Sequence, residues 1–291
     1  MGHKAGFVNI IGRPNVGKST LMNELVGEKL SIITPKIQTT RHRILGMVNE
    51  EDYQVIFSDT PGYLKPDYKL QESMMKFVED ALLDADIFLY ITTADEKDVD
   101  DDVVEKLKVS EVPVILVINK IDLSDQKKLE ALVEGWRQKL PKAEVIPISA
   151  LHKFNIDNLF NLILSLLPES PPYYPKDELT DKTMRFFVSE IIREKIFMNY
   201  QQEVPYSTEV IVDAYKEQED IINIMAYIFV LRESQKGIIL GKEGSAIKRT
   251  ATQARKDIEE FVGKKVFLEI RVKVSKDWRD DEKKLKRFGY D

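Results

Sequence analysis

The chain has 291 residues, which at about 150 residues per domain suggests two domains. Apolar residues make up 43% and charged residues 32% of it, which excludes a wholly disordered chain. The absence of cysteine excludes a disulfide framework, a thiolate zinc site and a cysteine nucleophile. The longest nearly apolar run, residues 221–231, is shorter than the ~18 to 20 residues of a membrane-spanning helix. We therefore expect a cytoplasmic protein.

Charge is distributed unevenly along the chain. The whole sequence has a net charge of −6, whereas residues 236–291 carry 16 basic and 10 acidic residues. This asymmetry indicates the C-terminal end for any contact with a polyanion, but the charge counts alone favour an ordinary solvated face.

In the first 167 residues, apolar runs of strand length alternate with segments of helical period, which is typical of a parallel sheet with crossover helices. We expect strands at residues 7–11, 44–48, 54–58, 87–92, 114–118 and 145–148. We expect helices at residues 17–26, 70–83, 99–108, 125–139 and 156–167. The strands at 44–48 and 54–58 are too close for a crossover helix and are predicted to form an antiparallel hairpin. The fold class is therefore α/β, with a mostly parallel six-stranded sheet.

Four prolines between Pro168 and Pro175 predict an extended connector. Beyond it the pattern changes. We expect a helix at 184–200, strands at 207–215 and 221–231, a helix pair around 241–244 that ends at 261, a strand at 265–274 and a short charged helix. The predicted organisation is one domain at 1–170, a linker at 171–183 and an α+β domain at 184–291.

A phosphate-binding loop is predicted between the first strand and the first helix, where residues 12–19 match GxxxxGK[ST]. Glycines in such a loop let backbone N–H groups face a phosphate, and the helix dipole favours the anion. Lys18 would reach the β- and γ-phosphates, and Ser19 would hold Mg²⁺. The candidate residues are Gly12, Arg13, Pro14, Asn15, Val16, Gly17, Lys18, Ser19 and Thr20.

A second candidate phosphate motif, Asp59-Thr60-Pro61-Gly62, follows the third predicted strand. Asp59 at the strand end can hold Mg²⁺ through water, and Gly62 can turn its N–H toward a γ-phosphate. Alone, the tetrapeptide is also a common turn. Its position after a strand that follows the phosphate loop favours the phosphate site.

Two further motifs predict recognition of guanine. Asn119-Lys120-Ile121-Asp122 ends the fifth strand, and Ser149-Ala150-Leu151 follows the sixth. A carboxylate at Asp122 accepts from both the ring N–H and the exocyclic amine of guanine, a donor pair that adenine lacks, so the site should select GTP over ATP. Ala150 would offer its N–H to the guanine oxygen, and Ser149 would brace Asp122.

These four motifs, in this order, resemble those of the Ras-like P-loop GTPases. The resemblance implies a switch threonine between residues 29 and 43 that holds Mg²⁺ when γ-phosphate is bound; Thr40 is favoured over Thr39. Ser19, Thr40 and Asp59 are thus the candidate metal ligands, and Lys18, Thr40 and Gly62 the candidate catalytic residues.

Tyr63 stands where Ras-type enzymes carry the glutamine that orients water. This resembles the TrmE-Era-EngA branch of GTPases, in which a hydrophobic residue replaces that glutamine. We therefore expect slow intrinsic hydrolysis, about 10⁻⁴ to 10⁻² s⁻¹. In some members of the branch the P-loop asparagine, here Asn15, helps bind K⁺, and the sequence leaves K⁺ open.

An RNA-binding module is predicted near the C-terminus. Residues 241–244 form a GxxG turn that lets a nucleic-acid backbone pass close to the chain, although a plain helix–helix turn has the same pattern. The order of elements resembles a type II KH domain, which binds about four unpaired nucleotides. The candidate RNA-binding residues are Ile238, Ile239, Gly241, Lys242, Glu243, Gly244, Ile247, Lys248 and Arg249, and each isoleucine is equally a candidate for the core.

The two domains together resemble the Era family of bacterial GTPases over essentially the whole chain. This implies a monomeric switch, with GTP or GDP and Mg²⁺, that grips the single-stranded 3′ end of small-subunit ribosomal RNA, does not bind DNA, and assists assembly of the small ribosomal subunit. The resemblance also implies peripheral contact with the inner membrane, but no amphipathic anchor stands out in this sequence. The alternative is a passive RNA-binding adaptor whose nucleotide domain is structural.

Overall fold

The computed structural model describes residues 2–95 and 101–290, so the predicted helix start at Val99 lies outside the described residues. The chain divides into two compact units. The first comprises Met1–Ser31, Thr40–Lys65 and Met74–Asp181; the second comprises Ile32–Thr39, Pro66–Ser73 and Lys182–Asp291.

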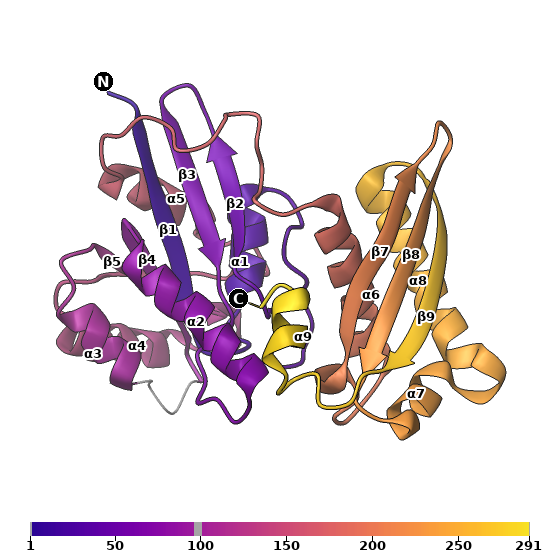
Figure 1. Ribbon diagram of the computed structural model, residues 1–291. Coiled ribbons are helices and arrows are strands. Elements are labelled where there is room, and N and C mark those ends of the chain that lie inside the picture. The colour runs from indigo at the N-terminus through magenta and orange to yellow at the C-terminus, as the bar shows by residue number, and fades with distance from the viewer. Residues whose placement is uncertain (1, 96–100, 291) are drawn as a thin grey trace. The chain divides into compact units, whose positions relative to one another are not determined.

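The first unit is built on a six-stranded sheet in the order β2-β3-β1-β4-β5-β6 (Figure 1). Its strands are β1 (Lys4–Gly12), β2 (Ile44–Asn49), β3 (Tyr53–Asp59), β4 (Ile87–Thr93), β5 (Val114–Asn119) and β6 (Glu144–Pro147). Only β2 runs antiparallel to its neighbour, which confirms the predicted edge hairpin. The central strands β4 and β5 are buried along their whole length, as expected for a sheet covered on both faces.

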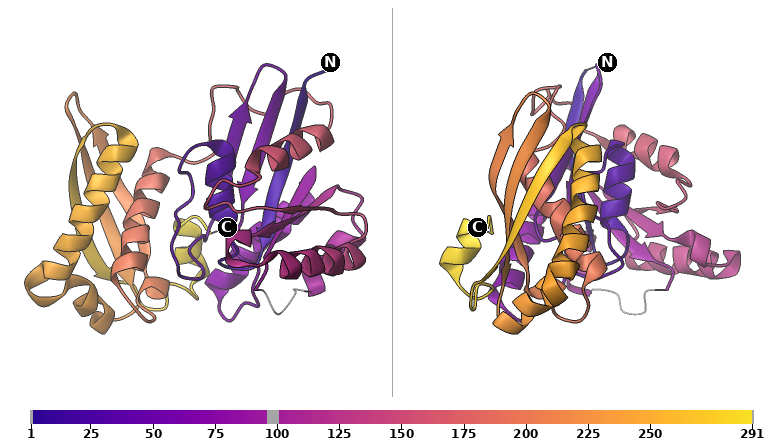
Figure 2. Two further views of the ribbon diagram at one scale, coloured as in Figure 1. Left: turned by 180° about the vertical axis from the view of Figure 1, so that it is seen from behind. Right: turned by 90° about the vertical axis from the view of Figure 1, so that its right-hand side faces the viewer.

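Helices cover both faces of this sheet. They are α1 (Lys18–Val26), α2 (Lys69–Leu83, which belongs to this unit from Met74 onward), α3 (Asp101–Lys108), α4 (Gln126–Lys139) and α5 (Ile156–Leu166). Helices α1 and α5 lie on one face, and α2 lies on the other (Figures 1 and 2). Local sequence sets the helix ends: Gly27 takes a left-handed conformation that closes α1, and the Asp125 carboxylate accepts from the Lys128 N–H at the start of α4.

The segment after α5 packs against the sheet of the first unit. The buried Gln54 amide of β3 accepts from the backbone N–H groups of Tyr173 (2.7 Å) and Tyr174 (3.0 Å). The same amide donates to the Tyr174 carbonyl oxygen at 2.9 Å. Residues that the prolines predict to be a linker are thus held by hydrogen bonds, because the extended chain needs partners for its backbone groups.

The second unit contains a three-stranded sheet in the order β7-β8-β9. The strands are β7 (Glu209–Glu217), β8 (Ile221–Val230) and β9 (Lys265–Val274); β7 is antiparallel and β9 parallel to β8. The helices are α6 (Met184–Asn199), α7 (Glu233–Leu240), α8 (Ser245–Val262) and α9 (Glu282–Arg287). Alternate residues of β8 are buried, beneath α6 and α8 on one face (Figure 2). The predicted element order is confirmed.

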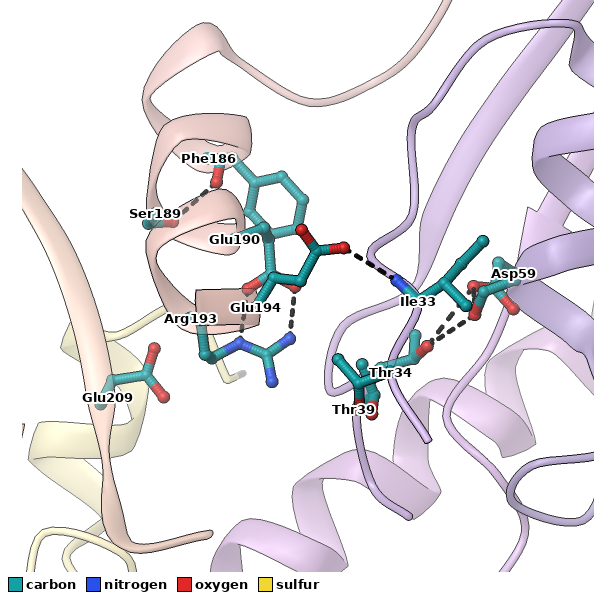
Figure 3. Close-up of polar contacts among 12 residues, drawn as sticks. Ile33, Thr34, Thr39, Asp59, Phe186, Ser189, Glu190, Arg193, Glu194 and Glu209 are labelled. Atoms are coloured by element: carbon teal, nitrogen blue, oxygen red, sulfur yellow. Dashed lines mark hydrogen bonds and ion pairs between the residues drawn. The ribbon is translucent and has the colours of Figure 1, made fainter. Parts of the chain in front are cut away.

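A buried ion pair lies inside helix α6 (Figure 3). The Arg193 guanidinium donates to both carboxylate oxygens of Glu190, through Nε at 2.8 Å and through Nη2. Burial lowers the pKa of Arg193, but the charge and the hydrogen bonds of Glu190, together with the charges of Tyr290 and Glu209, outweigh burial and hold the pKa above its ordinary value. Nearby, the Tyr290 hydroxyl donates to Glu209 at 2.8 Å, so the C-terminal segment is part of this unit.

Residues 32–39 pack within the second unit, on helix α6. The Ile33 N–H donates to the Glu194 carboxylate at 3.3 Å (Figure 3). The Lys36 ammonium donates to the carbonyl oxygens of Phe197 (2.6 Å) and Tyr200 at the C-terminal end of α6. Nothing in the local sequence predicts this, because the segment stands between two motifs of the first unit.

Across residues 2–95 and 101–290, every helix is too short or too polar to span a lipid bilayer.

Candidate nucleotide and RNA-binding sites

Two glycines determine the path of the phosphate-binding loop. Gly12 has φ +154° and Gly17 has φ +100°, values that side chains disfavour. A Cβ at Gly12 would lie 2.4 Å from the Ile91 carbonyl oxygen, and one at Gly17 would lie 2.3 Å from the Asn119 side-chain nitrogen. The loop can therefore approach β4 and the base-recognition motif only with glycine at both positions.

The Asp59-Thr60-Pro61-Gly62 loop passes directly against the phosphate-binding loop. A Cβ at Gly62 would lie 2.6 Å from the Pro14 backbone nitrogen, and the Tyr63 N–H donates to the Gly12 carbonyl oxygen at 3.2 Å. The two phosphate motifs, about 50 residues apart in sequence, are adjacent because β1 and β3 are neighbouring parallel strands.

The Lys18 ammonium lies within the phosphate-binding loop. It donates to the carbonyl oxygens of Gly12 (2.9 Å) and Arg13 (2.7 Å), and the residue is 5% exposed. A single cation held at the helix N-terminus favours an anion at this position.

Three oxygen-bearing side chains converge beside Lys18. The Ser19 hydroxyl donates to the Asp59 carboxylate at 2.7 Å and lies 2.9 Å from the Thr40 hydroxyl, which is 3.5 Å from the same carboxylate oxygen. The Thr39 hydroxyl instead contacts Thr34 at 2.6 Å and the Lys36 carbonyl oxygen at 2.8 Å. Thr40, rather than Thr39, is therefore brought to the candidate metal ligands.

The chemistry of Asp59 fits a divalent cation. Its side chain is buried, and among the described residues its Oδ1 atom has no hydrogen-bond partner. Burial raises the pKa of Asp59, while the Lys18 charge and the Ser19 and Thr40 hydroxyls oppose the rise. One carboxylate and two hydroxyls are oxygen ligands of the kind that Mg²⁺ prefers.

The base-recognition motif is joined to the phosphate-binding loop. The Asn119 side chain donates to the Val16 carbonyl oxygen at 2.8 Å and accepts from the Ala150 N–H at 3.0 Å. The Lys120 ammonium donates to the Asn15 carbonyl oxygen at 2.7 Å. The Ala150 N–H, predicted to face the guanine oxygen, thus has a protein acceptor in this structure. The Leu151 side chain is exposed.

Asp122 is held as a carboxylate at the surface end of this motif, in the 3₁₀ turn η1 (Ile121–Leu123). The Ser149 hydroxyl donates to it at 2.6 Å, as predicted, and this bond lowers the pKa of Asp122 below its ordinary value. His152 Nε2 lies 3.7 Å from the other carboxylate oxygen. The position of His152 beside Asp122 could not be predicted, because a single histidine in a polar loop carries no signal of its partner.

Removing the brace should weaken guanine binding. Ser149→Ala deletes one hydrogen bond to a carboxylate, worth about 1.5 to 3 kcal/mol, so we expect affinity for GDP to fall by about tenfold. Isothermal titration calorimetry checks this. Ser165→Ala, which removes a hydroxyl bonded to the Leu162 carbonyl oxygen, is the control; unchanged affinity in Ser149→Ala would contradict the role of the brace.

The GxxG turn links helices α7 and α8 through the 3₁₀ turn η3 (Lys242–Gly244). Gly241 has φ +69°, and a Cβ there would lie 2.6 Å from the Ala246 Cβ atom. Gly244 has φ +78°, and a Cβ there would meet no described atom within 4 Å. Gly241 is therefore required by the turn itself, whereas the space beside Gly244 is open to a passing backbone.

The three isoleucines near this turn differ in burial. Ile238 is 51% exposed, whereas Ile239 is 0% exposed and belongs to the hydrophobic core of the unit. Ile247 is partly buried and packs against that core. The prediction that the Ile239 side chain contacts RNA is wrong, since it faces the sheet. Around the turn, Lys242, Glu243, Lys248 and Arg249 are all exposed.

Comparisons with known proteins agree with both sites. A family model described as 50S ribosome-binding GTPase matches residues 7–120, and a KH domain model matches residues 203–279. GTPase Era of Thermoanaerobacter sp. (strain X514) is 47% identical, covering 100% of this chain and 97% of that protein. GTPase Era of Clostridium kluyveri (strain NBRC 12016) is 46% identical, covering 99% of both.

Two solved structures match over 99% of both chains. One is Era in complex with MgGDPNP and nucleotides 1506–1542 of 16S ribosomal RNA, with a TM-score of 0.95 and 40% identity. The other is Aquifex aeolicus Era Y63A bound to GDP and AlF₄⁻, with a TM-score of 0.94 and 41% identity. With the nucleotide motifs at adjacent strand ends and a KH domain following, the chain belongs to the Era family of GTPases.

Proposed function

We propose that this chain is a GTP-controlled switch that binds the single-stranded 3′ end of small-subunit ribosomal RNA and assists assembly of the small ribosomal subunit. The observation that carries the proposal is the match over 99% of both chains to an Era structure in complex with MgGDPNP and 16S ribosomal RNA. The GTPase domain is assigned to residues 1–170 and the RNA-binding domain to residues 184–291. The protein is proposed to act in the cytoplasm as a monomer.

The phosphate site supports binding of GTP with Mg²⁺. Ser19, Thr40 and Asp59 would hold the cation, and Lys18 would contact the β- and γ-phosphates. When bound, Mg²⁺ neutralises charge on the phosphate oxygens. Asp59 contributes its buried carboxylate, whose Oδ1 atom is without a partner among the described residues.

Hydrolysis in this site depends on positioning rather than on a side-chain base. Tyr63 occupies the place of the Ras-type glutamine, so Lys18 and the N–H groups near Gly62 orient and stabilise the γ-phosphate. Slow intrinsic turnover follows, because a tyrosine side chain cannot orient the attacking water as the glutamine amide does. K⁺ at Asn15 is part of the proposal, and comparing turnover in KCl with turnover in NaCl tests it.

The RNA site is proposed at the GxxG turn and the start of α8. Lys242, Lys248 and Arg249 are exposed there and would contact phosphates, while the exposed Ile238 would lie under a base. The open space beside Gly244 lets the RNA backbone approach the peptide chain.

Charge reversal at this surface should weaken RNA binding without affecting GTP hydrolysis. We expect Lys242→Glu with Lys248→Glu to lower affinity for a short single-stranded RNA at least about tenfold and to flatten its salt dependence, since each lost phosphate contact changes the slope by about 0.7. Fluorescence anisotropy at stated salt measures both. Lys216→Glu with Lys283→Glu makes the same charge change at exposed positions of β7 and α9, and equal loss in both pairs would contradict the site.

The alternative function, a passive RNA-binding adaptor with a structural nucleotide domain, is tested by measuring GTP turnover with and without RNA. A switch whose RNA and nucleotide sites are coupled should change its turnover when RNA is bound. Identical turnover at saturating RNA would favour the adaptor.

A further inference from the structure

Arg43 lies three residues after Thr40, immediately before β2, and its guanidinium has three protein partners. Nε donates to the Ser58 hydroxyl at 2.7 Å. Nη1 and Nη2 donate to the two carboxylate oxygens of Asp84 at 2.7 and 2.9 Å, and Nη2 lies 3.3 Å from the Asn9 Oδ1 atom. Such a forked contact fixes the orientation of the group as well as its position.

Asn9 completes a network around Arg43. It is buried in β1, and its side-chain nitrogen donates to the Ala81 carbonyl oxygen at 2.6 Å and to Asp84 at 2.7 Å. Asn9 and Ser58 are direct register partners on β1 and β3. The network therefore joins the end of α2, the strand that leads to the phosphate-binding loop and the strand that leads to Asp59.

Thr40 and Arg43 hold neighbouring residues of β3 from its two sides. Successive side chains of a strand point to opposite faces of the sheet, so Ser58 and Asp59 face opposite ways. Thr40 contacts Asp59, and Arg43 contacts Ser58. Three residues span at most about 10 Å of chain, so fixing Arg43 restricts the positions that Thr40 can take.

We propose that Arg43 is a positioning residue that holds Thr40 against Ser19 and Asp59 and connects that position to the end of α2 through Asp84. The inference rests on the proposed role of Thr40 as a Mg²⁺ ligand in the GTP state. A threonine of this kind contacts the metal only when γ-phosphate is present. Loss of Arg43 should therefore weaken the GTP state and leave the GDP state nearly unchanged.

The test is the ratio of affinities for GDP and for a non-hydrolysable GTP analogue at fixed Mg²⁺. We expect Arg43→Ala to lower affinity for the analogue about tenfold more than affinity for GDP, and to slow turnover at saturating GTP. Arg43→Lys keeps the charge but loses the fork and should give a smaller shift. Gln54→Ala removes a fully buried hydrogen-bonding group from β3 and should leave the ratio unchanged.

Thr40→Ala, measured alongside Arg43→Ala, distinguishes an error in the proposed role of Thr40 from an error in the inference about Arg43. If Thr40→Ala leaves the ratio unchanged, the proposed role of Thr40 is wrong. If Thr40→Ala shifts the ratio while Arg43→Ala does not, or lowers both affinities equally, the inference about Arg43 is overturned. If Arg43→Ala does not fold, Asp84→Asn replaces it, because Asp84 is half-exposed. The inference is then overturned if both Asp84→Asn and Arg43→Lys leave the ratio of GDP to analogue affinities unchanged.

Discussion

An Asp122→Asn variant will lose its preference for guanine and gain affinity for xanthine nucleotides. The wild-type carboxylate can accept from both donors of guanine, and losing two hydrogen bonds to a charged group costs about 3 to 6 kcal/mol. We therefore expect affinity for GDP to fall at least about a hundredfold. Xanthine carries a carbonyl in place of the exocyclic amine, and an asparagine amide can donate to that oxygen. Competition between GDP and XDP, measured by fluorescent nucleotide displacement, checks both changes.

Asp125→Asn is the matched control for this exchange. Asp125 lies three residues away and accepts from the Lys128 N–H as the cap of α4, a role that asparagine fulfils equally well. GDP affinity should be unchanged in this variant. Retained guanine preference in Asp122→Asn would place the base site elsewhere.

Lys18→Ala should abolish useful nucleotide binding. The ammonium would contact two phosphates, so its removal should lower affinity for GTP and GDP at least about a hundredfold. Its charge also opposes the rise in the pKa of Asp59 that burial causes. Without Lys18 the carboxylate protonates more readily, and the variant should need more Mg²⁺ to bind the analogue. Equilibrium dialysis over a Mg²⁺ series measures both effects.

Lys4→Ala is the control for Lys18→Ala, because it removes a lysine that has no predicted contact with phosphate. The Lys4 ammonium also donates to a backbone carbonyl oxygen, that of Leu164, at 2.9 Å, but it lies at the start of β1. Its loss should leave nucleotide affinity unchanged. GDP affinity in Lys18→Ala equal to that of Lys4→Ala would exclude residues 12–19 as the phosphate site.

Much of the nucleotide site could be predicted from sequence because its signals are local. Each motif follows a recognisable apolar strand, and parallel strands bring their carboxyl ends to one edge of the sheet. The sequence therefore assigns Gly12 and Gly62 to one site. The contact of Ser149 with Asp122 followed from the same reasoning.

The network around Arg43 could not be predicted, because its members are far apart in sequence. Asn9 and Asp84 lie 34 and 41 residues from Arg43, and each alone is an ordinary polar residue. Only the register of β1 with β3 and the end of α2 brings them together. For the same reason, the packing of Lys36 on the end of α6 carries no sequence signal.

Burial at the RNA site was also beyond the sequence. Helix α7 has only eight residues, and a run of three apolar residues before a glycine does not show which one faces the sheet. The structure buries Ile239 and exposes Ile238. The hydrogen bond from the Tyr200 hydroxyl to the Ile239 carbonyl oxygen, at 2.8 Å, fixes that orientation.

The most direct test of the switch is equilibrium binding of the full chain to a short single-stranded RNA from the small-subunit 3′ end. The RNA is titrated at fixed salt, once with GDP and once with a non-hydrolysable GTP analogue, each with Mg²⁺. The proposed switch predicts tight binding with the analogue and weak binding with GDP. Equal affinity in the two nucleotide states would contradict it.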